Sequence, residues 1–179
     1  GMKVLDLGCG LGGPARLLAD EFGCDVTGID ITKEYIEVAG QLSAMTGLQN
    51  KTRFIRGNAL DLPFANESFD VVWTQHVQLN IAGKKKFYEE ITRVLLPQGR
   101  LIYYDVFSIN DQSLYLPLPW ADEPSMNHLV TTDVFHRLLE QTGLTLIQEI
   151  DETAKAISFF EKTLQRIDTK DFPPVGLHL

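Results

Sequence analysis

At 179 residues, 44% of them hydrophobic, the chain is long enough for one domain whose single core needs neither disulfides nor a structural metal. The formal net charge of −8 argues against a nucleic-acid partner, because affinity for the phosphate backbone comes from clusters of Lys and Arg. No run approaches the roughly 18 apolar residues of a membrane-spanning helix, so no membrane partner is expected either.

Strand and helix patterns alternate from the beginning of the chain, where Gly1 before Met2 looks like a scar of tag removal. Strands are predicted at 3–7, 24–30, 52–58, 69–75, 100–107 and 144–150, and helices at 13–22, 32–45, 84–95, 132–142 and 153–167. Thr32 is expected to cap the second helix, and the sequence PQG at 97–99 to end the third. The connection at 109–129 is long for a structureless loop, so it is predicted as an insertion over the active face or as a partly helical segment.

This alternation predicts the fold class. Strands separated by helices form parallel βαβ units, so we expect an α/β protein with a three-layer, doubly wound, mostly parallel sheet, similar to the Rossmann fold. The whole chain, 1–179, is predicted as a single domain with a cofactor half at 3–80 and a substrate-side half at 81–179. Continuous apolar residues around Trp73 indicate a strand buried on both faces, with Trp73 in the core.

Lys84, Lys85 and Lys86 form the only basic cluster, and a solvated helix end explains it best. The two cysteines, Cys9 and Cys24, make neither a disulfide framework nor a metal quartet, so no metal site is predicted. With no signal peptide ahead of the first strand, the expected location is the cytoplasm.

The stretch VLDLGCGLGG at 4–13 is the first candidate site, and its glycines fit two patterns. Gly8, Gly10 and Gly13 satisfy the dinucleotide fingerprint G-x-G-x-x-G, while Asp6 followed by alternate glycines gives D-x-G-x-G-x-G. Asp30 follows about 20 positions on, where an acidic side chain can accept hydrogen bonds from ribose hydroxyls. A tight structural turn and a helix-capping role for Asp30 are the alternatives.

Further candidates lie at the predicted carboxyl ends of the strands, where an open parallel sheet binds its ligand. The segment GNALDLPF at 57–64 follows the third strand, and TQHVQLN at 74–80 follows the fourth. His76 is a candidate base, with a hydrogen-bonded structural histidine as the alternative. Tyr115 and Trp120, in the long connection, are equally compatible with a core and with a pocket wall.

Four segments together resemble the class I S-adenosylmethionine-dependent methyltransferases. They are VLDLGCGLGG, VTGIDIT, FIRGNALDLPFANESFDVVWTQHV and FYEEITRVLLPQGRLIYYDV, and they span residues 4–106. The resemblance implies S-adenosylmethionine as cofactor and S-adenosylhomocysteine as product. The implied cofactor-binding residues are Asp6, Gly8, Cys9 and Gly10 at the methionine portion, Asp30 at the ribose, Ile31, Asn58 and Ala59 at the adenine, and Gln75 near the methionine end. Asn58 stands where many relatives have Asp, but its amide oxygen can still accept from the adenine amino group.

Within this family, the sequences of the four segments are most similar to those of the small-molecule branch, which includes quinone C-methyltransferases and sarcosine or dimethylglycine N-methyltransferases. Enzymes that modify nucleic-acid bases have a D/N-P-P-Y motif after the fourth strand, whereas this sequence has TQHV at that position. The resemblance therefore implies in-line methyl transfer to an N, O or C nucleophile of a small molecule, with alignment as the main requirement. His76 is the candidate base, Gln75, Gln78 and Asn80 orient the acceptor, and Tyr115, Trp120 and His128 are the expected substrate-side walls.

The sequence departs from the family pattern in two ways, and the last hypothesis follows from them. Relatives have an N-terminal helical segment before the glycine motif and a seventh strand at the end, whereas this sequence ends in PPVGLHL. A core fragment with an open cleft, reduced turnover and a tendency to form a homodimer is the resulting hypothesis. An NAD-dependent oxidoreductase domain and a non-catalytic S-adenosylmethionine-binding module are the alternative functions.

Overall fold

The computed structural model describes residues 1–110 and 114–168, which fall into two compact units, Gly1–Thr145 and Leu146–Leu179. The first unit contains β1 (Lys3–Leu7), α1 (Gly13–Phe22), β2 (Asp25–Asp30), α2 (Lys33–Met45), β3 (Thr52–Arg56), β4 (Phe69–Gln75), the 3₁₀ turn η1 (Gln78–Asn80), α3 (Lys84–Val94), β5 (Leu95–Tyr104), the 3₁₀ turn η2 (Pro124–Met126) and α4 (Thr132–Gln141). The second contains α5 (Thr153–Asp168). The prediction that the whole chain is one domain stays a prediction.

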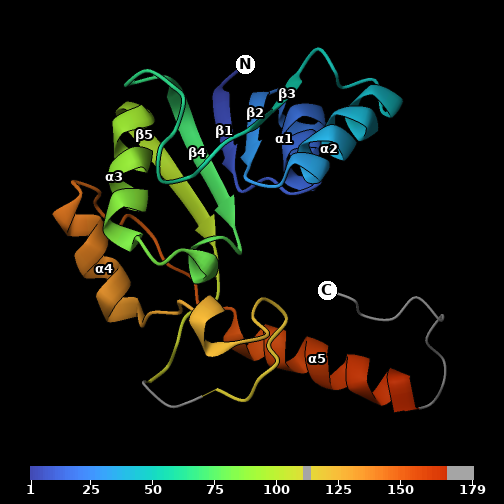
Figure 1. Ribbon diagram of the computed structural model, residues 1–179, viewed down its shortest axis with the longest axis vertical. Coiled ribbons are helices and arrows are strands. Elements are labelled where there is room, and N and C mark those ends of the chain that lie inside the picture. The colour runs from blue at the N-terminus through green and yellow to red at the C-terminus, as the bar shows by residue number, and fades with distance from the viewer. Residues whose placement is uncertain (111–113, 169–179) are drawn as a thin grey trace. The chain divides into compact units, whose positions relative to one another are not determined.

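The first unit is built on a five-stranded sheet of order β3-β2-β1-β4-β5, in which every pair is parallel. Figure 1 shows α1 and α2 beside β1–β3 and α3 on the other side of the sheet. The chain reverses its direction of winding between β1 and β4, and the carboxyl ends of these two strands form the switch point where open sheets bind ligands. The predicted doubly wound α/β fold is confirmed.

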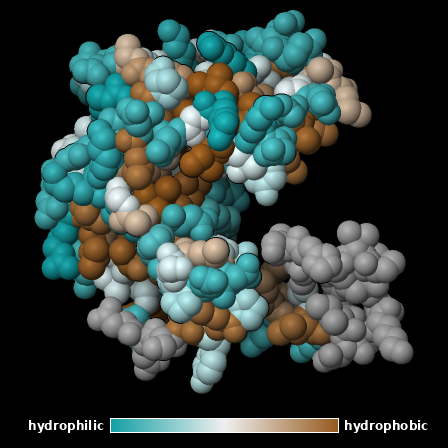
Figure 2. Space-filling view, viewed as in Figure 1, coloured by the Kyte–Doolittle hydropathy of each residue, from teal (hydrophilic) through white to brown (hydrophobic). Residues whose placement is uncertain are grey.

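Side chains of β1 point alternately to the two faces of the sheet, and a separate apolar core lies on each face. Val4 packs with α1 residues such as Ala15 in the smaller core, while Leu5 and Leu7 pack in the larger core with residues of α3 and α4 such as Ile91. Each fully buried Val or Leu stabilises the fold by roughly 1.5–3 kcal/mol, so both layers hold β1 in place. In the view of Figure 2, hydrophilic residues cover much of the outer surface, with apolar residues visible between them.

The boundary between α3 and β5 differs from the prediction. The helix ends at Val94 and β5 begins at Leu95, so PQG at 97–99 lies inside the strand and does not end the helix. The ladder shifts register between Phe69 and Val71, opposite this segment, and Gln98 has a φ of 65°. A bulge of this kind accommodates a proline within a strand.

The predicted sixth strand at 144–150 is wrong, since these residues pair with no strand in the described part of the chain. Leu144 packs partly against the larger core, but Ile147 is 83% exposed and Ile150 66%. The connection at 109–129 is partly helical, as expected, through η2, although 111–113 lie outside the described residues, as does PPVGLHL. The final helix is confirmed as α5, and none of the helices in the described residues is both long and apolar enough to cross a membrane.

Candidate cofactor and acceptor site

The glycine loop between β1 and α1 has a backbone that distinguishes its two sequence patterns. Gly8, Gly10 and Gly12 have φ values of 75°, 50° and 73°, in the left-handed region that favours glycine, whereas Gly13 does not and begins α1. The three left-handed positions are those of D-x-G-x-G-x-G. The conformation therefore favours this pattern over the dinucleotide fingerprint.

Two of these glycines allow close packing, and one faces open space. A Cβ on Gly8 would lie 2.4 Å from Cγ2 of Val77, and one on Gly12 would lie 2.6 Å from the ring of Phe54. A Cβ on Gly10 would meet nothing within 4 Å. Gly10 is thus the point of the loop where a ligand can approach the backbone closely.

Asp30, the last residue of β2, joins the glycine loop to the beginning of α2. Its Oδ2 accepts a hydrogen bond from the Gly10 amide at 3.0 Å, and its Oδ1 accepts from the Thr32 amide at 2.9 Å. Thr32 occupies the N-cap position of α2 but its side chain makes no capping bond there, so the predicted Thr32 cap is wrong and Asp30 satisfies the Thr32 N–H group. The two candidate cofactor segments lie within hydrogen-bond distance of each other.

Asp6 is buried on β1, beside the N-terminus of α1, with only 2% exposure. Burial raises the pKa of its carboxyl to about 7, the Asp30 charge adds to this shift, and the Ala15 amide opposes it. Its Oδ2 has no hydrogen-bond partner among the described residues. A buried carboxyl oxygen without a partner is costly, and it is an acceptor that a ligand can use.

The predicted adenine-side residues lie after β2 and β3. Ile31 is 64% exposed and available for contact with a flat ring, and its carbonyl accepts from Nε of Arg56 at 3.1 Å. The Asn58 amide oxygen accepts from the Leu60 amide at 2.9 Å, which holds the loop, and Ala59 packs partly against the larger core. Asn58 Oδ1 keeps a second lone pair for a ligand.

The segment after β4 carries the predicted acceptor-side residues. Gln75 pairs with Tyr104 of β5, and His76 is an exposed residue with a φ of 55° whose ring lies 5.0 Å from that of Tyr104. Gln78 is 3% exposed, and its Oε1 has no partner in the part of the chain described. Asn80, by contrast, is exposed.

The three predicted wall residues are not equivalent. The Tyr115 side chain is 96% exposed, whereas Trp120 is half-buried and its Nε1 donates to Oδ1 of Asn127 at 3.1 Å. The His128 amide donates to the Leu79 carbonyl at 2.9 Å. The structure therefore brings His128 beside the segment after β4 and leaves Tyr115 in solvent.

Sequence reasoning missed two residues beside this segment, Asp105 and Lys84. Asp105 directly follows β5, but the strand predicted at 100–107 extended past it, so the rule that identified Asp30 after β2 did not single it out. Lys84 was assigned to a solvated helix end, but it is 8% exposed, while Lys85 and Lys86 are exposed as predicted. Only burial, which a short lysine run does not reveal, separates it from its neighbours.

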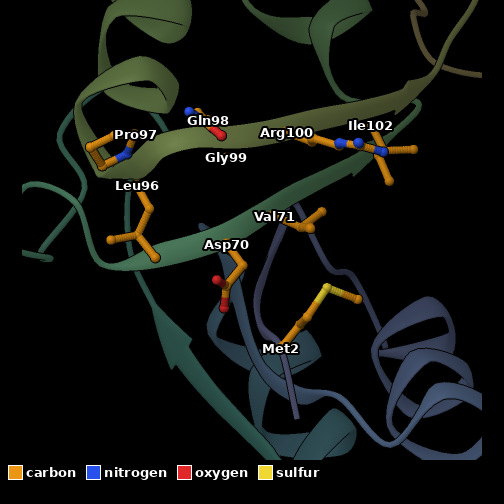
Figure 3. Close-up of a pocket in the computed structure, with 9 residues that line it drawn as sticks. All are labelled: Met2, Asp70, Val71, Leu96, Pro97, Gln98, Gly99, Arg100 and Ile102. Carbon is orange, nitrogen blue, oxygen red and sulfur yellow. The ribbon is translucent and has the colours of Figure 1, made fainter.

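A cavity of about 450 Å³ lies elsewhere, near the amino ends of β1 and β4 (Figure 3). It is lined by Met2, Asp70, Val71, Leu96, Pro97, Gln98, Gly99, Arg100 and Ile102. None of the predicted site residues lines it. Cys9 and Cys24 are both buried and unpaired, and the described residues contain no group of three or more His, Cys, Asp or Glu placed to hold a metal ion.

The chain belongs to the methyltransferase domain family, because the family model of that description matches residues 1–164. It is 29% identical over 168 residues to the sarcosine/dimethylglycine N-methyltransferase of Aphanothece halophytica, covering 94% of this chain and 61% of the relative. It is 34% identical over 153 residues to the 2-methyl-6-phytyl-1,4-hydroquinone methyltransferase of Synechocystis sp., covering 80% of this chain and 46% of the relative.

Among solved structures, the fold is similar to that of phosphoethanolamine N-methyltransferase 2 of Haemonchus contortus in complex with S-adenosyl-L-methionine. The TM-score is 0.80 at 22% sequence identity, with 96% of this chain and 39% of that chain covered. The chain thus spans about half the length of the curated relatives described here. The resemblance to the small-molecule methyltransferases is confirmed.

Proposed function

We propose that the carboxyl ends of β1, β2 and β4 bind S-adenosylmethionine and that the protein transfers its methyl group to a small-molecule acceptor, releasing S-adenosylhomocysteine. The observation that carries this proposal is the pairing of the Gly10 amide with the Asp30 carboxylate beside open space at Gly10. Family membership and the left-handed D-x-G-x-G-x-G loop support it. The open backbone at Gly10, the buried free oxygen of Asp6 and the carboxylate of Asp30 fit a ligand with an ammonium group and a ribose diol.

In this assignment each segment has a separate part of the cofactor to hold. Asp6, Gly8, Cys9 and Gly10 surround the methionine portion, with Gln75 near its end. Asp30 accepts from the ribose hydroxyls, while Ile31, Asn58 and Ala59 contact the adenine. When bound, the cofactor supplies a sulfonium methyl that is already activated for displacement.

The protein's remaining task is alignment of the acceptor with that methyl group. His76, exposed on the left-handed turn after β4, removes a proton from an acceptor that arrives protonated. Gln78 and Asn80 orient a polar acceptor, with Trp120, His128 and Tyr115 on the substrate side. Gln78 is the best supported of these, because its buried Oε1 lacks a partner within the described residues.

The acceptor is proposed as a small amine or a hydroquinone, the classes named for the two relatives described above. A cytoplasmic location, the absence of a nucleic-acid partner and a homodimer are parts of the same proposal, the second resting on the net charge of −8. The oxidoreductase alternative is not favoured by the family. A non-catalytic binding module differs from the enzyme only in lacking methyl transfer.

Cofactor binding is tested by calorimetry and thermal shift with S-adenosylmethionine, S-adenosylhomocysteine and NAD. A ligand at 100 times its Kd stabilises the protein by about 2.7 kcal/mol, so selectivity is readily measured. Asp30→Ala should weaken S-adenosylhomocysteine binding by roughly 10- to 100-fold, the value of a hydrogen bond to a charged group. Asp25→Ala is the matched control, because Asp25 lies at the opposite end of β2 and pairs with Lys51 in solvent. Preferential stabilisation by NAD would reject the proposal.

Methyl transfer is tested with radiolabelled cofactor and a panel containing sarcosine, dimethylglycine and 2-methyl-6-phytyl-1,4-hydroquinone. His76→Gln should lower kcat by about 100-fold for an acceptor that binds protonated, the usual contribution of a general base. Selective S-adenosylhomocysteine binding without transfer to any acceptor would favour the non-catalytic module.

A further inference from the structure

The turn after β4 is held in a conformation that its own sequence does not favour. His76 has a φ of 55°, in a region that non-glycine residues rarely adopt. The 3₁₀ turn η1 has only three residues, too few for its own hydrogen bonds to hold its conformation. The turn nevertheless carries His76, Gln78 and Asn80, three side chains assigned to the acceptor. Contacts from outside the turn must therefore fix it.

Asp105 holds the amino end of this turn. Its Oδ2 accepts from the amides of Val77 at 3.1 Å and Gln78 at 3.0 Å, while Oδ1 accepts from the Val106 amide at 2.9 Å. Burial raises the pKa of Asp105, and these three amides and His76 oppose the shift. Both carboxylate oxygens are thus used, and two of the three bonds go to the turn.

Lys84 holds the other end. Its Nζ donates to the carbonyl of Ile81 at 2.7 Å and to that of Gln78, and the side chain is buried. Burial lowers the pKa of Lys84 to about 8, and the negative charge of Asp105 opposes this shift. The Asp105 carboxylate therefore accepts from the amides of Val77 and Gln78 at the beginning of η1, and the Lys84 ammonium donates to the carbonyls of Gln78 and of Ile81, which directly follows η1.

The held turn touches both sides of the candidate site. The His76 amide donates to the Tyr104 carbonyl at 2.9 Å and the two rings are in contact, so His76 is fixed in backbone and side chain. Val77, bound by Asp105, packs where Gly8 leaves no room for a Cβ. A shift of the turn would therefore displace the acceptor-side residues and the glycine loop together.

We propose that Asp105 and Lys84 are positioning residues that clamp the turn at 76–81 and so align His76 and Gln78 with the bound methyl donor. This inference rests on the proposed methyl transfer, and neither residue touches the reacting atoms in it. The clamp fixes the positions of His76 and Gln78 relative to the methyl donor. Its loss therefore lowers kcat more than it raises KM for the acceptor.

The test compares Asp105→Ala, Asp105→Asn and Lys84→Met with two matched controls. Asp70→Ala removes a carboxylate that accepts from the Lys3 amide at 2.8 Å at the amino end of β4, away from the turn after β4, and Lys85→Met removes an exposed lysine next to Lys84. The measurements are the NMR resonances of the His76 ring protons, the melting temperature, and kcat and KM for dimethylglycine at saturating S-adenosylmethionine.

Asp105→Ala and Lys84→Met should each lower kcat by about 100-fold, the effect of a misplacement of about 1 Å, and shift the His76 resonances. Asp105→Asn keeps an oxygen for the Val77 and Gln78 amides and should recover most of kcat. The control variants Asp70→Ala and Lys85→Met should have the same kcat and the same His76 resonances as the wild type. Unchanged His76 resonances, or a kcat loss no larger than that of the controls, would overturn the clamp.

Two outcomes are kept separate by this design. If Asp105→Ala does not fold, Asp105→Asn and Lys84→Met decide the question, since both preserve the volume of the buried side chain. If the wild type transfers no methyl group to dimethylglycine or to any acceptor of the panel, the proposed function fails. The comparison of His76 resonances still decides whether the clamp exists.

Discussion

Two regions of the first unit bury a carboxylate, and they treat it in opposite ways. On α3, Glu90 is 4% exposed, and its carboxylate accepts from the Leu62 amide at 2.8 Å, from Nη2 of Arg93 at 2.7 Å and from Nζ of Lys86 at 2.9 Å. Beside the glycine loop, Asp6 is 2% exposed and one of its oxygens has no partner among the residues described. The Arg93 bond, with Lys86 and Leu62, lowers the pKa of Glu90 to about 2, while burial raises that of Asp6 to about 7.

The difference separates a stabilising network from the candidate binding site. A buried charge with several donors joins α3 to the loop before β4 and favours the fold, whereas a buried carboxyl with an unused oxygen lowers stability until a ligand supplies a donor. The cavity near the amino ends of the strands is lined by none of the predicted site residues. The buried oxygens of Asp6 and Gln78, unsatisfied within the described residues, both belong to predicted site residues.

The largest expected effect is the pH dependence that Asp6 imposes on stability. Its pKa is higher in the folded protein than the usual 3.8, so folding favours the protonated form. The resulting penalty is absent below about pH 4, grows as the pH rises, and is complete above about pH 7. Asp6→Asn removes it, so the variant should gain about 3 kcal/mol relative to the wild type between pH 5 and pH 8.

Urea unfolding of both proteins at a series of pH values measures this gain. Groups that do not interact with Asp6 titrate equally in the two proteins, so their contributions cancel in the difference. The same substitution should weaken S-adenosylhomocysteine binding, because the amide no longer carries the acceptor charge. A pH-independent difference would show that the Asp6 carboxyl titrates normally and would remove the contrast with Glu90.

Glu90 should show a smaller effect of opposite sign. Its folded pKa is lower than 4.5, so its contribution to stability is fully present above about pH 5 and is lost as the pH falls toward 2. Glu90→Gln should cost about 2 kcal/mol at pH 7 and clearly less at pH 3, measured by the same urea titration.

Glu89→Gln is the matched control for this experiment. Glu89 is the neighbouring residue of α3 and pairs with Lys85 in solvent, where an ion pair contributes less than about 1 kcal/mol. Cofactor binding should be unchanged in both variants, since neither glutamate lies at the candidate site. Equal losses for Glu89→Gln and Glu90→Gln would mean that the buried network contributes nothing beyond a surface pair.

Much of the fold was predictable, because it follows from local periodicity. Buried parallel strands, glycine-terminated turns and amphipathic helices are signals within about 15 residues of sequence, and they located β1 to β4 and all five α-helices of the described residues. The error at 144–150 arose because a short apolar segment becomes a strand only if another strand pairs with it. The sequence contains no signal for that pairing.

The candidate site was predictable where a motif has fixed spacing. Asp30 and Gly10 are 20 residues apart and meet as a hydrogen-bonded pair. Asp105 lies 28 and 27 residues from the amides of Val77 and Gln78, and nothing in its local sequence indicates their contact. Lys84 shows the same limit, since its burial depends on the turn that it binds.

The smallest effect concerns the shape of the glycine loop. Gly10→Ala places a methyl group where nothing lies within 4 Å, so its stability cost comes only from the left-handed φ and should be about 1 kcal/mol. Gly40→Ala is the control: Gly40 is also free of contacts but lies inside α2, where Ala should stabilise by about 1 kcal/mol.

Calorimetry then separates stability from binding in these two variants. If the space at Gly10 receives the methionine portion of the cofactor, Gly10→Ala should weaken S-adenosylhomocysteine binding by more than its small stability cost accounts for, and Gly40→Ala should not affect binding. The Asp30 bond to the Gly10 amide survives the substitution, so a loss of affinity would report the added methyl group itself. Undiminished affinity in Gly10→Ala would show that the ligand does not contact the loop at Gly10. The unpaired oxygen of Asp6 would then be the better indication of where the cofactor binds.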